Sequence, residues 1–341
     1  MNKNTSYIYL YAANPGALSV LIPVYQYLKE KSERPVWVIE NIDYQSDDFI
    51  YYQQFEDMFK TEKDLKNKPI LIGAQVNTSR THQIIDQCNT SGMKTFFITD
   101  HWKNDHKQFF GGQKVFLPLI IFCIDDYMKN KFINFGIPEH KLEIVGHPSL
   151  ERTSKTIFSK SDIKTIRNNL NIDKTRMLVS VFLDPVHDDL NNNYGYDEYD
   201  VLTFIFDVFS KKNLPEICLI IKVHPRQCKE DILQFVQQHK TIHCIVDQKS
   251  DPIELIMVSD KVMGMTSIAL MHAIILNKEC CSIQINRTQA GIERSDIYLE
   301  QLLVEHHDQL YDFICNPQKR LAINFETNSC QKIYDSIRKN K

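Results

Sequence analysis

The sequence predicts an α/β protein made of two doubly wound domains, each a parallel sheet with helices on both faces. Short apolar runs of strand length alternate with stretches whose apolar residues recur at helical spacing, which is typical of a parallel sheet covered on both sides. The alternation stops at Gly146-His147-Pro148 and then restarts. A length of 341 residues is also too great for one ordinary core and suits two domains.

The first domain is predicted to cover residues 1–150. Its apolar runs predict strands at residues 7–12, 35–39, 69–72, 94–98, 119–124 and 142–145. Its helical stretches are residues 17–30, 79–90 and 126–135. Helical connections of this kind join neighbouring parallel strands, so these elements predict one sheet.

The second domain is predicted to cover residues 151–325, beginning with a polar linker at 151–160. Its strands are predicted at residues 177–182, 216–223, 242–246, 261–265 and 280–283. Its helices are predicted at residues 161–169, 200–210, 229–239, 252–257 and 267–276. Residues 185–197 form a long polar loop, either a functional flap or a plain insertion. Residues 326–341 are predicted to form a C-terminal helix that can pack back on the N-terminal domain.

Composition excludes several classes of function. The net charge of −3 gives no general attraction to nucleic acid, so we expect no nucleic-acid partner and at most peripheral membrane association. No apolar run approaches the roughly 20 residues of a membrane span. Nine scattered cysteines without a CxxC pair favour a reduced, cytoplasmic protein. The glycine-rich phosphate loops GxGxxG and GxxxxGK[ST] are absent.

The most informative segment is residues 218–226, which read CLIIKVHPR. A buried strand is predicted to end in Lys222, His224 and Arg226, at the edge where α/β sheets bind ligands. Strand alternation would place these three side chains on one face, although Pro225 bends the exit. Their nitrogen atoms suit a phosphate. The alternative is that Lys222 and Arg226 are solvated and His224 is a capping residue.

A second strand exit at residues 261–267 (KVMGMTS) places two hydroxyl groups, Thr266 and Ser267, at the start of a helix. A helix start offers free backbone N–H groups and a dipole that favours an anion. The alternative is a plain helix cap.

Several segments resemble the GT-B glycosyltransferases. Residues 135–150 (FGIPEHKLEIVGHPSL) are similar to the domain-joining segment of lipid A disaccharide synthase and UDP-N-acetylglucosamine 2-epimerase. The KVHPR segment resembles the HP motif of bacterial sialyltransferases, Kdo transferases and CDP-glycerol glycerophosphotransferases, and residues 251–278 resemble a later run of the same enzymes. The chain departs from these families at His272, where the family often has a ribose-binding glutamate. It also lacks the H-R-x-E-N segment of the epimerases, where Leu183-Asp184-Pro185 stands.

This resemblance implies a GT-B fold, in which two Rossmann-like domains face a central cleft. It implies a nucleotide-sugar donor bound by the second domain, with no metal or other cofactor. Preorganised donors would stabilise the charge that builds on the leaving phosphate. The residues predicted to contact the donor phosphate are Lys222, His224, Arg226, Thr266 and Ser267. His272 would lie near the donor nucleoside.

The resemblance also implies an acceptor side in the first domain. In GT-B proteins the first strand-to-helix turn, here Asn14-Pro15-Gly16, lines that side, and glycine allows close approach of the backbone. Gln75 lies at a further strand exit. Asp100 or His101 could remove the proton of the acceptor hydroxyl, so both are candidate catalytic residues beside His224. The alternatives are an ordinary turn at Gly16 and a capping role for Asp100.

The predicted activity is therefore transfer of a sugar from a nucleotide-activated donor to a saccharide (glycan), lipid-linked or protein acceptor. The reaction would be metal-independent and inverting, in surface-polysaccharide or glycoconjugate biosynthesis. One alternative is a UDP-sugar 2-epimerase on the same scaffold. Another is a non-catalytic GT-B-like binding protein.

Overall fold

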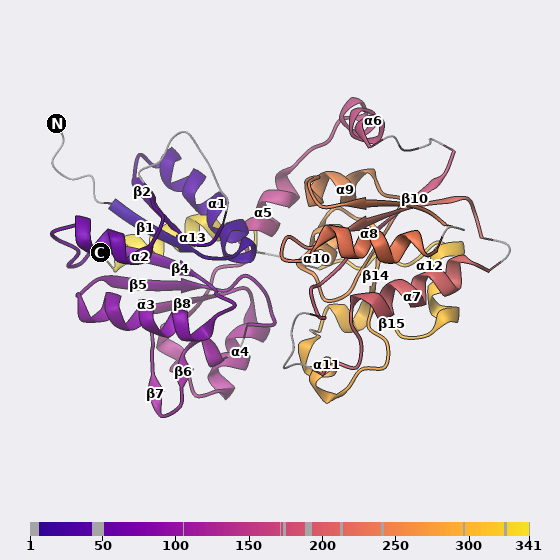
Figure 1. Ribbon diagram of the computed structural model, residues 1–341. Coiled ribbons are helices and arrows are strands. Elements are labelled where there is room, and N and C mark those ends of the chain that lie inside the picture. The colour runs from indigo at the N-terminus through magenta and orange to yellow at the C-terminus, as the bar shows by residue number, and fades with distance from the viewer. Residues whose placement is uncertain are drawn as a thin grey trace. The chain divides into compact units, whose positions relative to one another are not determined.

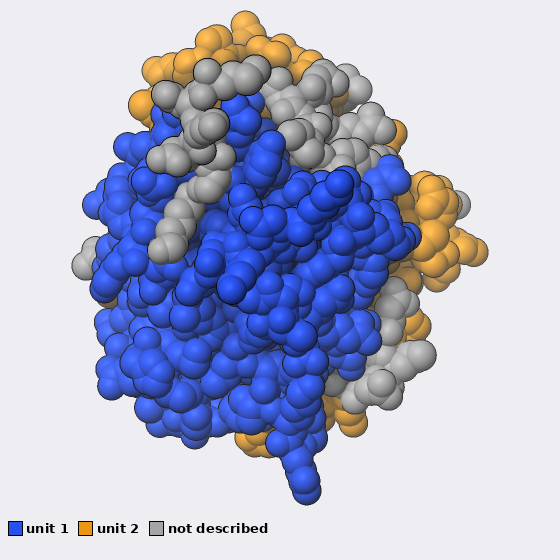
Figure 2. Space-filling view, turned by 90° about the vertical axis from the view of Figure 1, so that its left-hand side faces the viewer, with its two compact units in different colours: residues 1–152, 325–341 blue, residues 153–324 orange. Residues whose placement is uncertain are grey.

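The computed structural model describes residues 7–42, 51–104, 106–170, 172, 175–187, 193–211, 214–239, 242–295, 297–323 and 326–340. The chain forms two compact units, unit 1 comprising Met1–Arg152 with Phe325–Lys341, and unit 2 comprising Thr153–Asn324 (Figure 2). Residues 188–192 of the predicted polar loop lie outside the described residues.

Unit 1 is built on a seven-stranded parallel sheet in the order β3-β2-β1-β4-β5-β8-β9 (Figure 1). Its strands are β1 (Tyr7–Ala12), β2 (Arg34–Ile39), β3 (Tyr51–Tyr52), β4 (Pro69–Gly73), β5 (Lys94–Ile98), β8 (Ile120–Cys123) and β9 (Leu142–Ile144). The central strands β4, β5 and β8 are almost wholly buried because helices cover both faces, which explains their continuous apolar sequence. The two-residue strand β3 was not predicted, because so short a segment has no readable alternation.

The helices of unit 1 come from both ends of the chain. The helices of unit 1 are α1 (Pro15–Glu30), α2 (Phe55–Thr61), α3 (Thr78–Thr90), α4 (Asp126–Asn134) and α13 (Ser329–Lys339). One face packs on α1 and α13, whose Ile333 and Ile337 join the core formed by Leu10 and Trp37. Figure 1 shows α13, in yellow, among the indigo elements of the N-terminus. A small hairpin, β6 (Phe110–Gly111) with β7 (Lys114–Val115), extends from the same unit.

The predicted linker is helical in its first part. Helix α5 (Pro148–Lys155) begins with Pro148, which suits a first helical position, and it contains the boundary between the units. The carboxyl group of Glu151 accepts a hydrogen bond from the Cys330 N–H at 3.3 Å, so α5 is fastened to α13. Its polar residues include the buried Glu151 and Thr153 as well as exposed ones, so the segment lacks the apolar spacing from which a helix is predicted.

Unit 2 has a six-stranded parallel sheet in the order β12-β11-β10-β13-β14-β15. Its strands are β10 (Met177–Phe182), β11 (Ile217–Lys222), β12 (His243–Asp247), β13 (Lys261–Gly264), β14 (Glu279–Ile283) and β15 (Leu303–Val304). Its other helices are α6 (Lys160–Asn169), α7 (Glu198–Phe209), α8 (Lys229–Gln237), α9 (Pro252–Val258), α10 (Ile268–Ile275), α11 (Gln289–Arg294) and α12 (His307–Cys315). Residues of α7, α8 and α12 share one core with alternate residues of β10 and β11.

Both sheets reverse their strand order at one point. In unit 1 the chain runs outward in opposite directions from β1 and β4, and in unit 2 from β10 and β13. In open α/β sheets the crevice at the carboxyl ends of such a strand pair is where ligands bind. The prediction of two doubly wound parallel sheets is confirmed, and it directs attention to residues that follow β1, β4, β10 and β13.

Part of the carboxyl edge of unit 1 is closed by a buried ionic network. Glu40, which follows β2, binds Arg80 at 2.6 Å and accepts the Tyr11 hydroxyl at 2.5 Å and the Phe55 N–H at 2.7 Å. Arg80 also binds Glu56 at 2.7 Å. Burial alone would raise the pKa of Glu40, but these hydrogen bonds outweigh it and hold the pKa below its usual value. The exits of β1, β4 and β5 remain as the candidate site.

Candidate functional site

The loops that follow β1 and β4 are joined by Asn14. Its side-chain oxygen accepts the Ala17 N–H at 2.9 Å and so caps α1. Its side-chain nitrogen donates to the Ala74 carbonyl at 2.8 Å and to Gln75 Oε1 at 3.2 Å. The structure therefore brings together Asn14 and Gln75, two of the three residues predicted for the acceptor side, at the strand reversal of unit 1.

Asp100 and Gly16, predicted separately, are in close contact. A Cβ atom built on Gly16 would lie 2.1 Å from Asp100 Oδ2, so the carboxyl group packs directly over the first turn of α1. Burial raises the pKa of Asp100 to about 6, although hydrogen bonding from Asn104 opposes the rise. A carboxyl group with such a pKa is a carboxylate at neutral pH and is basic enough to accept a proton.

The loop that carries Asp100 is rigidly held. The side-chain oxygen of Asn104 accepts the N–H groups of Asp100 at 3.0 Å and His101 at 3.1 Å. The buried Trp102 donates from its ring nitrogen to Asp125 at 2.7 Å, and Lys131 donates to the Trp102 carbonyl at 2.8 Å. The His101 Nδ1 accepts the Lys103 N–H at 3.0 Å. Asp100 is the stronger candidate for a base of the two, because Asn104 holds its backbone and burial raises the pKa of its carboxyl group.

His147 holds Asp100 from the other side. Its Nδ1 accepts the Leu150 N–H at 3.3 Å, so the neutral ring carries its proton on Nε2, which lies 3.1 Å from the Asp100 carbonyl. Burial lowers the pKa of His147 to about 4, so the ring is neutral at physiological pH. The expected structural role of this histidine is to bind the Asp100 backbone to the start of α5.

Replacing Gly16 by Ala tests the contact with Asp100. The new methyl group must displace the carboxyl group, because the two atoms would be 2.1 Å apart. We expect turnover to fall about 10- to 100-fold, since a misplacement of about 1 Å can have that effect. The fold should be little changed, because alanine favours the helix at this position. In an Asp100→Asn background the same substitution should add little further loss; a full additional loss would mean that Gly16 acts independently of Asp100.

At the strand reversal of unit 2, Asp184 binds Thr266. Asp184 Oδ2 accepts the Thr266 N–H at 3.0 Å and its hydroxyl at 2.5 Å. Thr266 is fully buried, and α10 begins only at Ile268, with Ser267 as its N-cap. Thr266 therefore links the exits of β10 and β13 through its hydrogen bonds to Asp184. Of the two predicted hydroxyl groups, only that of Ser267 lies at the start of the helix.

His224 and Arg226 form a tight turn after β11. The His224 N–H donates to Gln227 Oε1 at 2.8 Å, and the Arg226 N–H donates to His224 Nδ1 at 3.1 Å. A neutral His224 ring therefore carries its proton on Nε2. Arg226 is exposed and His224 is half-buried. The turn carries one imidazole ring and one guanidinium group at the edge of the sheet.

Lys222 lies apart from this pair. Its ammonium group is bound by Asp247 at 2.9 Å and by the Ser250 carbonyl at 2.5 Å, and the residue is buried. Asp247 is its neighbour in the register of β11 and β12. Burial would raise the pKa of Asp247, but Lys222 and Ser250 hold it below its usual value. Reading one strand alone missed this partner on the adjacent strand, so the predicted phosphate contact of Lys222 gives way to a buried ion pair.

His272 faces helix α5. Its Nδ1 lies 2.7 Å from the Thr153 hydroxyl, and the residue is only 6% exposed. The position at which the family often has a ribose-binding acid is used here to fasten α10 to α5. Little of the ring surface is open to a nucleoside.

Pattern reading did not select three buried polar residues near the β10 and β11 exits, namely Asp184, Glu198 and Gln227. Asp184 follows a buried strand just as Asp100 does, so the same strand-exit rule could have found it. Glu198 and Gln227 carry no comparable signal, because neither directly follows a strand and the hydrogen bond between them joins segments 29 residues apart.

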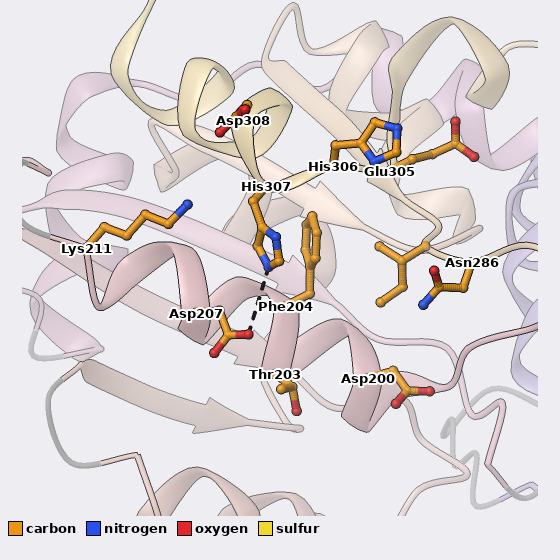
Figure 3. Close-up of a pocket in the computed structure, with 11 residues that line it drawn as sticks. Asp200, Thr203, Phe204, Asp207, Lys211, Asn286, Glu305, His306, His307 and Asp308 are labelled. Atoms are coloured by element: carbon orange, nitrogen blue, oxygen red, sulfur yellow. Dashed lines mark ion pairs between the residues drawn. The ribbon is translucent and has the colours of Figure 1, made fainter.

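A separate hollow of about 660 Å³ in unit 2 contains none of the predicted residues. One face of α7 and the start of α12 line it, and His307 stacks on Phe204 and lies 3.9 Å from Asp207 (Figure 3).

No group of three or more His, Cys, Asp or Glu side chains in the described residues is arranged to hold a metal ion. Within the same residues, no helix combines the length and apolar character that a membrane crossing requires.

Comparisons with known proteins identify the fold. No family model matches the sequence, and no curated protein matches it significantly. The structure is similar to UDP-GlcNAc 2-epimerase from Methanocaldococcus jannaschii in complex with UDP-GlcNAc and UDP, at 14% identity and a TM-score of 0.69 over 98% of this chain and 99% of that chain. It is similar to Anabaena HepE in complex with UDP and glucose, at 12% identity and a TM-score of 0.59 over 98% and 100%. A glycosyltransferase from Rickettsia africae gives 10% identity and 0.56 over 99% and 100%. With two doubly wound parallel sheets and these neighbours, the chain has the GT-B fold.

Proposed function

We propose that this protein is a glycosyltransferase that moves a sugar from a nucleotide-activated donor to an acceptor hydroxyl. The observation that carries the proposal is Asp100, a carboxyl group with a pKa raised to about 6, held over Gly16 at the exit of β5. A positioned base of this kind is what an acceptor hydroxyl needs. The acceptor, a glycan, a lipid-linked saccharide or a protein, would bind unit 1 beside Asn14, Gly16 and Gln75.

In the proposed reaction, Asp100 takes the proton of the acceptor hydroxyl while the acceptor oxygen attacks the anomeric carbon. The bond from that carbon to the phosphate oxygen breaks, and its electron pair leaves with the phosphate. Attack from the face opposite the leaving group inverts the anomeric centre. The developing negative charge would be stabilised by the Nε2–H of His224, by Arg226 and by the start of α10 at Ser267. The reaction would need no metal ion.

A 2-epimerase on the same scaffold remains the second candidate, because the M. jannaschii neighbour is a UDP-GlcNAc 2-epimerase. Incubation with UDP-sugars and no acceptor separates the two activities. Formation of an epimer, or of free UDP with a glycal, would favour the epimerase. Turnover that requires an acceptor would favour the transferase.

The donor is tested by calorimetry with UDP-, CMP-, CDP- and GDP-ligands, followed by transfer assays with the ligand that binds. We expect His224→Ala to lower kcat about 100-fold, because it removes one preorganised donor to the leaving phosphate. His243→Ala is the matched control, since that exposed imidazole lies at the opposite end of the neighbouring strand. Full activity in His224→Ala would remove His224 from the donor site, and a failure of every nucleotide to bind would leave only a non-catalytic binding protein.

A further inference from the structure

The turn that carries His224 is held by a buried pair of side chains, Glu198 and Gln227. Glu198 opens α7 and is 2% exposed, and Gln227 is 7% exposed. Glu198 Oε1 accepts the Gln227 side-chain N–H at 2.8 Å, and Gln227 Oε1 accepts the His224 backbone N–H at 2.8 Å. A continuous chain of hydrogen bonds therefore runs from the first turn of α7 to the backbone of His224.

The second oxygen of Glu198 holds the neighbouring loop. Glu198 Oε2 accepts the N–H groups of Val186 at 3.0 Å and His187 at 2.8 Å, just after β10. A carboxylate only accepts hydrogen bonds, so one side chain can bind three donors here without conflict. The exits of the adjacent strands β10 and β11 are thus fixed relative to each other by one buried carboxylate.

The orientation of the Gln227 amide follows from its partners. The His224 N–H can only donate, so it must meet the amide oxygen, and the carboxylate of Glu198 must then meet the amide NH₂ group. If the amide of Gln227 were rotated by 180°, its NH₂ group would face the His224 N–H and its oxygen would face the Glu198 carboxylate, and both hydrogen bonds would be lost. The turn is therefore held in one geometry, in which the Arg226 N–H points at His224 Nδ1 and leaves the ring proton on Nε2.

We propose that Glu198 and Gln227 are positioning residues for His224: they fix the 224–227 turn so that the ring presents Nε2–H to the phosphate of the donor. This inference rests on the proposed function for its effect on turnover. Its effect on the tautomer of His224 is independent of any activity.

The test is a charge exchange between the two positions. In Glu198→Gln the new amide NH₂ group faces the amide NH₂ group of Gln227, so one contact in the chain must break. In the double variant Glu198→Gln/Gln227→Glu every contact of the chain can form again, since the amide at 198 accepts from residues 186 and 187 and donates to the carboxylate at 227. That carboxylate then accepts the His224 N–H.

We expect Glu198→Gln to lower kcat by about 10- to 100-fold, as expected for a misplaced catalytic group, with little change in KM. The double variant should recover most of the lost kcat. Nitrogen-15 NMR of the histidine rings should show the Nε2–H tautomer of His224 in the wild type and the double variant, and a mixture of tautomers in the single variant.

The control is Asp200→Asn. Asp200 lies in the same turn of α7 and accepts the Asp197 N–H at 3.0 Å, so the substitution disturbs that turn. Within the described residues, Asp200 has no hydrogen bond to the 224–227 turn. An equal loss of kcat in Asp200→Asn, or an unchanged His224 tautomer in Glu198→Gln, would overturn the inference. Glu198 and Gln227 would then stabilise the fold without positioning His224. If the wild-type protein transfers no sugar, the proposed function fails, while the tautomer measurement still decides whether the pair positions His224.

Discussion

Replacing Asp100 by Asn should abolish transfer and at the same time stabilise the fold. The amide keeps the shape of the side chain but cannot take a proton, and loss of a positioned base typically lowers turnover by about 10²- to 10⁴-fold. The amide also removes a charge that the protein buries at neutral pH. Most substitutions of well-packed residues destabilise, so a loss of activity joined to a gain in stability is specific to this assignment.

The sign of the stability effect follows from the pKa. Burial raises the pKa of Asp100 from 3.8 to about 6 in the folded protein. The protonated form is thus favoured by the fold, so its contribution is fully present below pH 3.8 and is lost as the pH rises through about 6. The full shift corresponds to about 3 kcal/mol, and we expect about 1–2 kcal/mol because Asp100 is partly exposed and the N-terminus of α1 favours its charge.

Two measurements check this prediction. Urea unfolding should show Asp100→Asn to be more stable than the wild type at pH 7.5, with a difference that shrinks as the pH falls towards 4. The kcat/KM of the wild type should rise with pH through about 6 and then level off. A variant that is less stable at pH 7.5, or that retains most of its turnover, would show that Asp100 is a capping residue and not the base.

His147 supplies an internal control of opposite sign. Burial lowers its pKa from 6.5 to about 4, so its contribution to stability is present above 6.5 and is lost as the pH falls through about 4. In the wild type the two groups act against each other between about pH 4 and 6. The Asp100→Asn variant should therefore lose stability in acid more steeply than the wild type.

Sequence reasoning could locate the residues whose position depends on one strand alone. Asn14, Gln75 and Asp100 each come just after a buried strand, and the carboxyl ends of parallel strands share one edge, so the sequence could place all three at that edge, while their roles there stay predictions. It failed where a partner came from another strand or helix. Lys222 pairs with Asp247, Thr266 with Asp184, and His272 with Thr153, and each partner lies far away in the sequence. A one-dimensional pattern ranks side chains by type and exposure, but only the sheet order decides which of them are already engaged.

The prediction with the largest effect on stability is Lys222→Met. The substitution removes the cation that faces Asp247, whose side chain is only 14% exposed, and leaves that carboxylate without a counter-charge. Breaking one partner of a buried ion pair typically costs about 3–5 kcal/mol, and hydrogen bonds from Ser250 to Asp247 place our expectation near the lower end. Chemical unfolding monitored by circular dichroism measures this loss directly.

The double variant Lys222→Met/Asp247→Leu separates the two roles that Lys222 could have. A buried ion pair replaced by apolar side chains of similar size is often neutral in stability, so the double variant should recover much of the loss. Its affinity for the donor nucleotide should equal that of the wild type, because Lys222 is bound by Asp247 and Ser250 and lies apart from the His224 turn. If Lys222→Met instead kept full stability and lost nucleotide binding, the ammonium group would be a phosphate ligand, as the KVHPR segment alone indicates. The ammonium group of Lys222 already donates to Asp247 at 2.9 Å and to the Ser250 carbonyl at 2.5 Å, and for this reason the proposed donor site assigns the phosphate to His224 and Arg226.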